Sequence, residues 1–186
     1  VTIPDSVTTI GDGAFAESGL TEVVVPYVRN MGAGVFESCT ALTAVTLEQD
    51  VDEIPERTFN GCSDLSTIRF ADGGDLETIG ANAFSMTALT SISLPEGVTQ
   101  IDGTAFEDCA KLETVSLPAS IRNVGDMSFD GCTSLRSFAV SDDSTAYSAV
   151  DGILYSKDLA TLVRFPEASE RTEFSIPEGT VTISSG

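Results

Sequence analysis

Four cysteines are the residues of this sequence with the most versatile chemistry, because a thiol can form a disulfide, bind zinc or act as a nucleophile. They are Cys39, Cys62, Cys109 and Cys132, and each lies three residues after a phenylalanine. Neighbouring copies could bring Cys39 near Cys62, and Cys109 near Cys132, within reach of a disulfide. We favour free, buried thiols, since a free cysteine behaves as a small hydrophobic side chain.

Most residues that catalytic and metal sites depend on are missing. None of the 186 residues is a histidine, which removes the commonest general base and every Ser/His/Asp or Cys/His arrangement. A zinc site is disfavoured as well, because no Cys-x-x-Cys pair occurs. The sequence therefore predicts a protein that is not an enzyme and needs no cofactor or metal.

Carboxylates are abundant, with 29 acidic residues against nine basic ones and a formal net charge of −20. Asp72-Gly73-Gly74-Asp75 and Asp142-Asp143 could offer oxygen ligands to calcium, but their spacing matches no calcium loop, and we expect solvated turns. The charge repels nucleic acid and anionic lipid, so we predict no nucleic-acid partner. No apolar run approaches the roughly 18 residues of a membrane span, so we predict no membrane insertion in this segment.

Repeats of about 23 residues must position these groups. Each repeat opens with L-x-x-[IV]-x-[LVF], which is typical of a short strand because residues two apart share one face. A second apolar pair and then a phenylalanine follow. The spacings between the leading leucines are 22, 23, 24, 23 and 23 for Leu20, Leu42, Leu65, Leu89, Leu112 and Leu135. The phenylalanine column is Phe15, Phe36, Phe59, Phe84, Phe106 and Phe129. Such units bury a core only by stacking, so the pattern predicts a solenoid.

The consensus L-x-x-[IV]-x-L-P-x-x-[VI]-x-x-I-G-x-x-A-F-x-x-C resembles the BspA-like bacterial leucine-rich repeats from Val1 to Asp130. The resemblance implies a β-rich α/β fold: a right-handed leucine-rich-repeat solenoid with a parallel β-sheet. It also implies a surface or secreted protein engaged in adhesion or host-matrix binding. Pro55 and Asp102 replace a usual glycine, and Val35 replaces a small residue. We expect these departures to alter loops more than the solenoid.

The repeat lapses between Ser141 and Pro166, where residues 153–155 and 162–165 form two apolar stretches that predict a β-hairpin. We expect a single domain with a solenoid over 1–140, a hairpin insertion over 141–166 and a resumed array over 167–186. The insertion is either a spacer or a mark of the binding face. Both ends break off within a repeat without a polar cap, and Val1 falls inside a strand, so we expect a longer array.

Alternation predicts which residues the main sheet shows to solvent, namely the third and fifth of each repeat. They are Glu22, Val24, Ala44, Thr46, Thr67, Arg69, Ser91, Ser93, Thr114, Ser116, Ser137 and Ala139. Serine and threonine here are either good strand residues that pair across repeats or a flat docking surface. The candidate partner-binding residues are Thr46, Thr67, Arg69, Ser91, Ser93, Thr114 and Ser116.

These patterns favour a non-enzymatic protein-binding or adhesion module of a bacterial surface or secreted protein, located outside the cell or on its surface. The expected partner is a protein, and the resemblance implies host or extracellular-matrix proteins. A structural spacer or stalk that presents another domain is the alternative.

Overall fold

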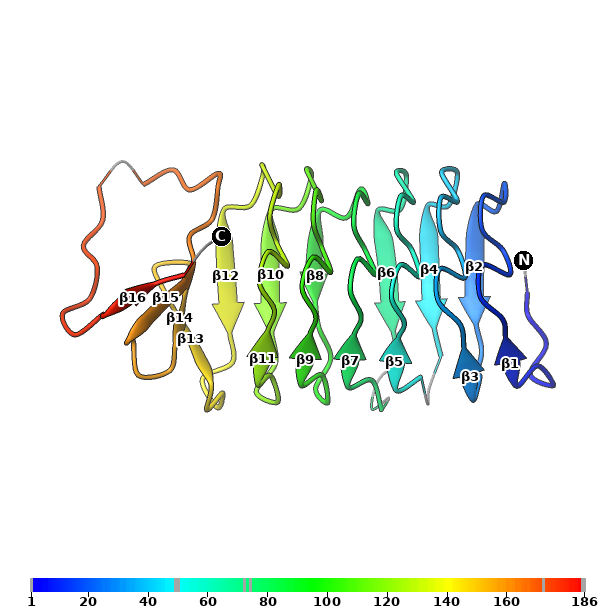
Figure 1. The fold of residues 1–186 in the computed structure, drawn as a ribbon, viewed down its shortest axis with the longest axis horizontal. Coiled ribbons are helices and arrows are strands. Elements are labelled where there is room, and N and C mark those ends of the chain that lie inside the picture. The colour runs from blue at the N-terminus through cyan, green and yellow to red at the C-terminus, as the bar shows by residue number, and fades with distance from the viewer. Residues whose placement is uncertain (1, 49–50, 72, 74, 172, 185–186) are drawn as a thin grey trace.

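The computed structural model describes residues 2–48, 51–71, 73, 75–171 and 173–184, so the strand expected at Val1 lies outside the described residues. The chain forms a parallel-strand solenoid of about seven turns with about 23 residues per turn. Figure 1 shows these turns, which we call coils, stacked along the long axis of the molecule. The described residues contain strands and turns but no helix, and the predicted leucine-rich-repeat solenoid is confirmed.

The first strand of each coil forms the main face of the solenoid. Alternate residues of these strands are buried, as in the exposed-buried-exposed-buried pattern of Glu22–Val25. The strands pair in parallel as two sheets of three. One sheet contains β2 (Glu22–Val25), β4 (Ala44–Leu47) and β6 (Thr67–Phe70); the other contains β8 (Ser91–Ser93), β10 (Thr114–Leu117) and β12 (Ser137–Val140).

A second row of two-residue strands lies on another side of the coils (Figure 1). One sheet pairs β1 (Thr9–Ile10) with β3 (Asn30–Met31), and the other runs through β5 (Glu53–Ile54), β7 (Thr78–Ile79), β9 (Gln100–Ile101) and β11 (Asn123–Val124). The residue that follows β3, β7, β9 or β11 donates its N–H to the preceding coil, as Gly80 does to Ile54 O at 2.8 Å.

Pro55 occupies this donor position after β5. Proline has no N–H to give, and the second row is interrupted between β3 and β5. A cavity of about 500 Å³ lined by residues 27–29, Asp52, Asp75 and Glu77 lies beside the interruption. We expected Pro55 to alter loops more than the solenoid, and the structure places it where it cannot donate the hydrogen bond that Gly80 donates one coil later.

The six phenylalanines stack along the axis, with neighbouring ring centroids 5.3–5.5 Å apart. The backbone beside them is hydrogen-bonded from coil to coil, as in Phe15 N–H to Val35 O at 2.9 Å and Phe106 N–H to Ser128 O at 2.8 Å. The second residue on either side of every phenylalanine has a positive φ of 55–73°. These paired left-handed residues fold the chain around each ring, and the column is the centre of a continuous core.

The chain after the last full coil forms a four-stranded sheet of mixed direction. Its strands are β13 (Tyr147–Val150), β14 (Ile153–Ser156), β15 (Thr161–Arg164) and β16 (Thr182–Ile183), in that order. β14 is antiparallel to both β13 and β15, and β16 is parallel to β15. The hairpin expected from the sequence corresponds to β14 and β15.

β12 and the hairpin both pack on the end of the phenylalanine stack. Phe138 of β12 meets the ring of Phe129 edge-on at 5.3 Å, and Leu154 of the hairpin belongs to the main core. The buried Arg164 guanidinium donates to Phe129 O at 3.0 Å and pairs with Glu167 at 3.1 Å. Glu167 accepts the N–H of Gly131 at 3.1 Å. The side chains of Arg164 and Glu167 thus form hydrogen bonds with backbone groups that a further coil would otherwise pair with.

Candidate partner-binding face and its opening

The twelve predicted face residues lie on the outer side of the main strands. None of them is buried, whereas the inward positions Val23, Val45, Ile92, Val115 and Phe138 are 0–4% exposed. Glu22 and Arg69 are the two charged members of the face. The alternation predicted from the sequence is therefore confirmed in all these strands except β6, where the inward Ile68 is half-buried. The side chains of the face are small and rich in hydroxyl groups.

The seven candidate binding residues fall into two registered groups. Thr46 lies opposite Arg69 across β4 and β6, in the same sheet as Thr67. Ser91 lies opposite Thr114, and Ser93 opposite Ser116, across β8 and β10. The sequence led us to expect a single sheet, but no ladder joins β6 to β8 among the described residues. The structure therefore does not bring Thr67 and Arg69 into register with Ser91 and Ser93.

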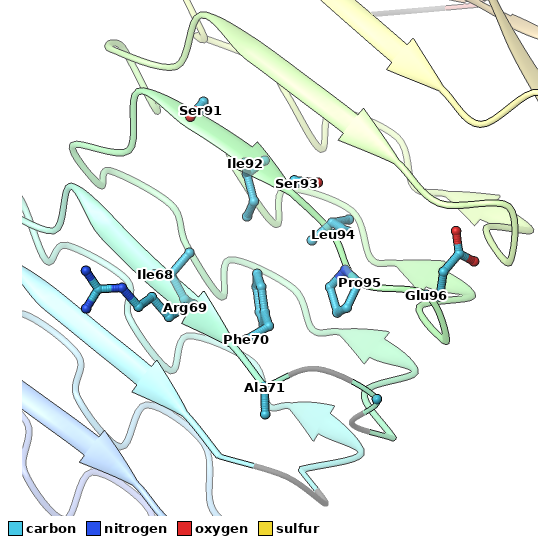
Figure 2. Close-up of a pocket in the computed structure, with 11 residues that line it drawn as sticks. Ile68, Arg69, Phe70, Ala71, Ser91, Ile92, Ser93, Leu94, Pro95 and Glu96 are labelled. Carbon is cyan, nitrogen blue, oxygen red and sulfur yellow. The ribbon is translucent and has the colours of Figure 1, made fainter.

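An opening separates β6 from β8, and Figure 1 shows these strands farther apart than their neighbours. Almost all Cα pairs between the two strands are more than 8 Å apart, against about 4.8 Å between hydrogen-bonded strands. The space has a volume of about 650 Å³ and is lined by residues 68–71, Gly73 and residues 91–96. We call this space the β6–β8 opening (Figure 2).

The rest of the two coils stays closed around this opening. β7 pairs with β9, and the rings of Phe84 and Phe106, which belong to the coils that begin at Leu65 and Leu89, lie 5.3 Å apart and are inclined by only 6°. The most inclined pair of the column, Phe59 and Phe84 at 20°, lies at the preceding step. The two coils thus diverge as a wedge, closed at the phenylalanine column and open at the main face.

The coil that begins at Leu65 has an unusual sequence on both sides of its core. Leu76 comes six residues after Phe70, whereas Val98 comes four residues after Leu94, and the next leucine comes five instead of six residues after Phe84. The longer loop and the shorter turn change where the next strand starts. These length changes account for the loss of pairing between β6 and β8.

Apolar side chains form the walls of the opening. Ile68 and Phe70 are half-buried, whereas the equivalent Val45 and Leu47 of β4 are buried. Figure 2 shows Ile68 and Phe70 reaching into the space between the strands, toward β8 and Pro95, while Arg69 points away from β8. Arg69 is exposed and forms no ion pair among the described residues. The opening is an apolar groove with a free cation at its rim.

Sequence reasoning missed the part played by Phe70, Leu94 and Pro95 in this opening. Strand alternation assigns Phe70 and Leu94 to the core, because it assumes that every coil meets its neighbour. The available signal was the spacing of 24 residues from Leu65 to Leu89, the longest in the array.

The four cysteines form one ladder beside the phenylalanines and are free and buried. Each thiol donates to the carbonyl oxygen of a phenylalanine one coil back: Cys39 to Phe15 at 3.0 Å, Cys62 to Phe36 at 3.1 Å, Cys109 to Phe84 at 3.0 Å and Cys132 to Phe106 at 3.2 Å. In the two coils without cysteine, Ser18 and Thr87 take its place and lie 3.2 and 3.3 Å from the next sulfur. The ladder is a structural hydrogen-bond system.

Burial suppresses the ionisation of two of these thiols. Desolvation raises the pKa of Cys62 to about 12 from an ordinary value of 9.0. A hydrogen bond with Cys109, together with burial, raises the pKa of Cys132, and the same hydrogen bond lowers the pKa of Cys109. A reactive cysteine needs the thiolate and access to solvent, and all four thiols are buried.

The acidic turns named in the sequence do not converge. Asp142 and Asp143 are exposed in a turn, while Asp72 and Gly74 lie outside the described residues. Over the described ranges, no three Cys, Asp or Glu side chains lie together in a way that could hold a metal ion. No helix in the described part of the chain is long and apolar enough to cross a membrane.

Stacked coils, a leucine-initiated strand in each coil and a phenylalanine column define a bacterial leucine-rich-repeat protein. The family model of the BspA type leucine rich repeat region matches residues 1–101 and 73–173 in six copies. The chain belongs to this family.

Solved structures with the same fold come from several bacteria. A leucine-rich repeat protein from Bacteroides ovatus is 32% identical, with a TM-score of 0.68 over 74% of this chain and 36% of that one. A leucine rich cell surface protein from Faecalibacterium prausnitzii is 28% identical, with a TM-score of 0.67 over 96% of this chain and 57% of that one. A leucine-rich repeat protein from Eubacterium ventriosum has a TM-score of 0.81 at 21% identity, over 98% of this chain and 50% of that one.

The chain thus spans 36–57% of the length of these three relatives. No curated protein matches it.

Proposed function

We propose that this chain is a non-enzymatic protein-binding module of a bacterial surface or secreted protein, and that it works in adhesion outside the cell. The observation that carries the proposal is the main face, where the candidate residues, uncharged except for Arg69, form an extended surface interrupted by one apolar opening. Large flat surfaces with an apolar centre and a polar rim are typical of protein interfaces. Membership of a repeat family that includes a cell surface protein supports the location.

Each of the three segments of the chain has its own proposed role. Residues 1–140 present the binding face, residues 141–166 cover the end of the phenylalanine stack, and residues 167–186 resume the array. The contacts of Arg164 and Glu167 with the last full coil support the covering role.

Binding of the purified chain to a panel of extracellular-matrix proteins, measured by surface plasmon resonance, tests this proposal. Thr46→Tyr, Ser93→Tyr and Thr114→Tyr place a ring on the face, and each should weaken binding to the matrix protein that the wild type captures. Thr133→Tyr is the control, because Thr133 is exposed in a turn outside the face.

Two results would contradict the proposal. Equal binding by all face variants would place the contact elsewhere on the molecule. If the wild-type chain binds no matrix protein, adhesion is contradicted and the alternative function of a spacer or stalk is favoured.

A further inference from the structure

We infer that the β6–β8 opening receives an extended peptide segment of the partner protein, which pairs as an added strand with β6 and β8. The inference rests on the proposed binding function and names the form of the ligand at its centre. Addition of a strand to a free sheet edge is a recurrent mode of peptide recognition, in which backbone hydrogen bonds supply affinity and alternate side chains supply specificity.

The backbone of both strands offers free groups to the opening. Leu94 donates its N–H to Ser116 O of β10 at 3.1 Å, so the N–H and C=O groups of Ser91 and Ser93 point the other way, toward β6. On the opposite side, the Ala71 N–H donates to Leu47 O of β4 at 3.0 Å. The backbone groups of Ile68 and Phe70 therefore point toward β8. Two unpaired edges face each other across the space.

The separation of the two strands exceeds that of a paired ladder. Inserting a strand between two others requires about twice the normal spacing, or roughly 9.6 Å. The Cα atoms of β6 and β8 lie almost entirely beyond 8 Å from each other. A strand inserted at the required spacing would restore a continuous sheet of seven strands across the main face.

The side chains around the opening specify the peptide. Residues of an added strand alternate between the inner and outer sides of the sheet. Those directed inward would contact Ile68 and Phe70, the half-buried apolar residues, so they should be apolar. The residue between them would emerge beside Arg69, whose exposed guanidinium lacks a partner among the described ion pairs. The geometry therefore favours an apolar-acidic-apolar tripeptide.

A fluorescent peptide provides a direct probe of this site. The peptide copies residues 112–118 of the chain with Ser116→Glu, because that segment already has apolar residues at its inward positions. Its matched partners carry Ser116→Lys, or carry Ser116→Glu with N-methyl groups on two central amides. Binding to the intact chain is measured by fluorescence anisotropy.

The glutamate peptide should bind about two- to fivefold more tightly than the lysine peptide, which is the effect of one exposed ion pair. Arg69→Glu should reverse that preference, whereas Lys111→Glu, the same charge change outside the opening, should leave it unchanged. N-methylation should weaken binding roughly tenfold or more, because it removes backbone donors and leaves the side chains intact. Equal binding of the methylated peptide, or an unchanged preference in Arg69→Glu, would overturn the inference.

Failure of this inference can be told apart from failure of the proposed function. Ser93→Pro removes an N–H that faces the opening and spares the bonds from β8 to β10. Loss of the matrix ligand in Ser93→Pro, with folding intact by circular dichroism, supports strand addition. Retention of that ligand in Ser93→Pro, with loss in Thr114→Tyr, would contradict strand addition and leave the binding face in place.

A second copy of the chain is the other conceivable occupant. Light scattering of the purified chain decides this point. A monomer at concentrations where the peptide binds is the result expected, and a dimer dissociated by the peptide would replace the partner protein with a second copy.

Discussion

The rings of Phe84 and Phe106 lie 5.3 Å apart and are inclined by only 6°. They belong to the coils that begin at Leu65 and Leu89, whose main strands β6 and β8 do not pair among the described residues. The phenylalanine column therefore holds two coils together while the main face opens between them.

Removing one ring tests the column as core. Phe84→Ala should lower the free energy of unfolding by about 3–5 kcal/mol, because Phe84 is fully buried between two other rings. Urea denaturation followed by circular dichroism measures the change. Met86→Ala is the control in the same turn, since Met86 is 53% exposed, and it should change stability by less than about 0.5 kcal/mol. Equal losses in the two variants would rule out a packed column.

The backbones of neighbouring coils lie close together at some glycines, which leads to a second prediction. Gly11 and Gly80 both follow the isoleucine of a short strand. A Cβ atom on Gly80 would lie 2.7 Å from the backbone nitrogen of Glu56, while one on Gly11 would meet nothing within 4 Å. Gly80→Ala should therefore cost about 1–3 kcal/mol, and Gly11→Ala should cost nothing measurable. Thermal denaturation of both variants provides the comparison, and a similar melting temperature for the two would contradict the coil spacing.

The hydroxyl that replaces a cysteine in the ladder supplies a third prediction. Thr87 is 4% exposed and its hydroxyl lies 3.3 Å from the Cys109 sulfur. Thr87→Val keeps the shape and removes the hydrogen bond, so it should destabilise the fold by about 1 kcal/mol. Thr90→Val, at the exposed residue before β8, should be neutral. Chemical denaturation of both variants measures the difference, and a neutral Thr87→Val would show that the ladder does not depend on this hydroxyl.

The buried thiols predict a loss of stability in alkali. Desolvation raises the pKa of Cys62 to about 12, above its ordinary value of 9.0. A folded-state pKa above the unfolded value means that the stabilisation is complete below about pH 9 and disappears as the pH rises toward 12. Cys62→Ser keeps a donor for Phe36 O and does not ionise in this range. Urea midpoints at pH 8 and pH 10.5 should fall further in the wild type than in Cys62→Ser; equal falls would contradict the prediction.

Most of the fold could be predicted from the sequence, because each element repeats. Leucines 22–24 residues apart and six phenylalanines in register determine the coil length, and alternation assigns Val45 to the core and Thr46 to the surface. The position of the cysteines indicated one ladder. Their hydrogen bonds to the carbonyl groups of the preceding coil could not be predicted, since they depend on the path of the backbone between coils.

The breaks in the two strand rows were not predicted, because each depends on local exceptions to the repeat. Pro55 was recognised as a departure, but its consequence comes from the missing N–H at a donor position that the consensus does not reveal. The opening beside Phe70 results from one long loop and one short turn in the same coil. Loop lengths can be counted in a sequence, whereas the direction in which they displace the next strand requires coordinates.

Amide hydrogen exchange at Ser93 and Ser116 tests the opening most directly. The two serines are register partners on β8 and β10. A β-branched residue precedes each of them, Ile92 before Ser93 and Val115 before Ser116. The Ser93 N–H points into the opening, while Ser116 lies within the ladder. The amide hydrogen of Ser93 should exchange on the order of a hundredfold faster than that of Ser116 in the free chain. Equal protection of the two amides would show that β6 and β8 are paired in solution and would contradict the opening.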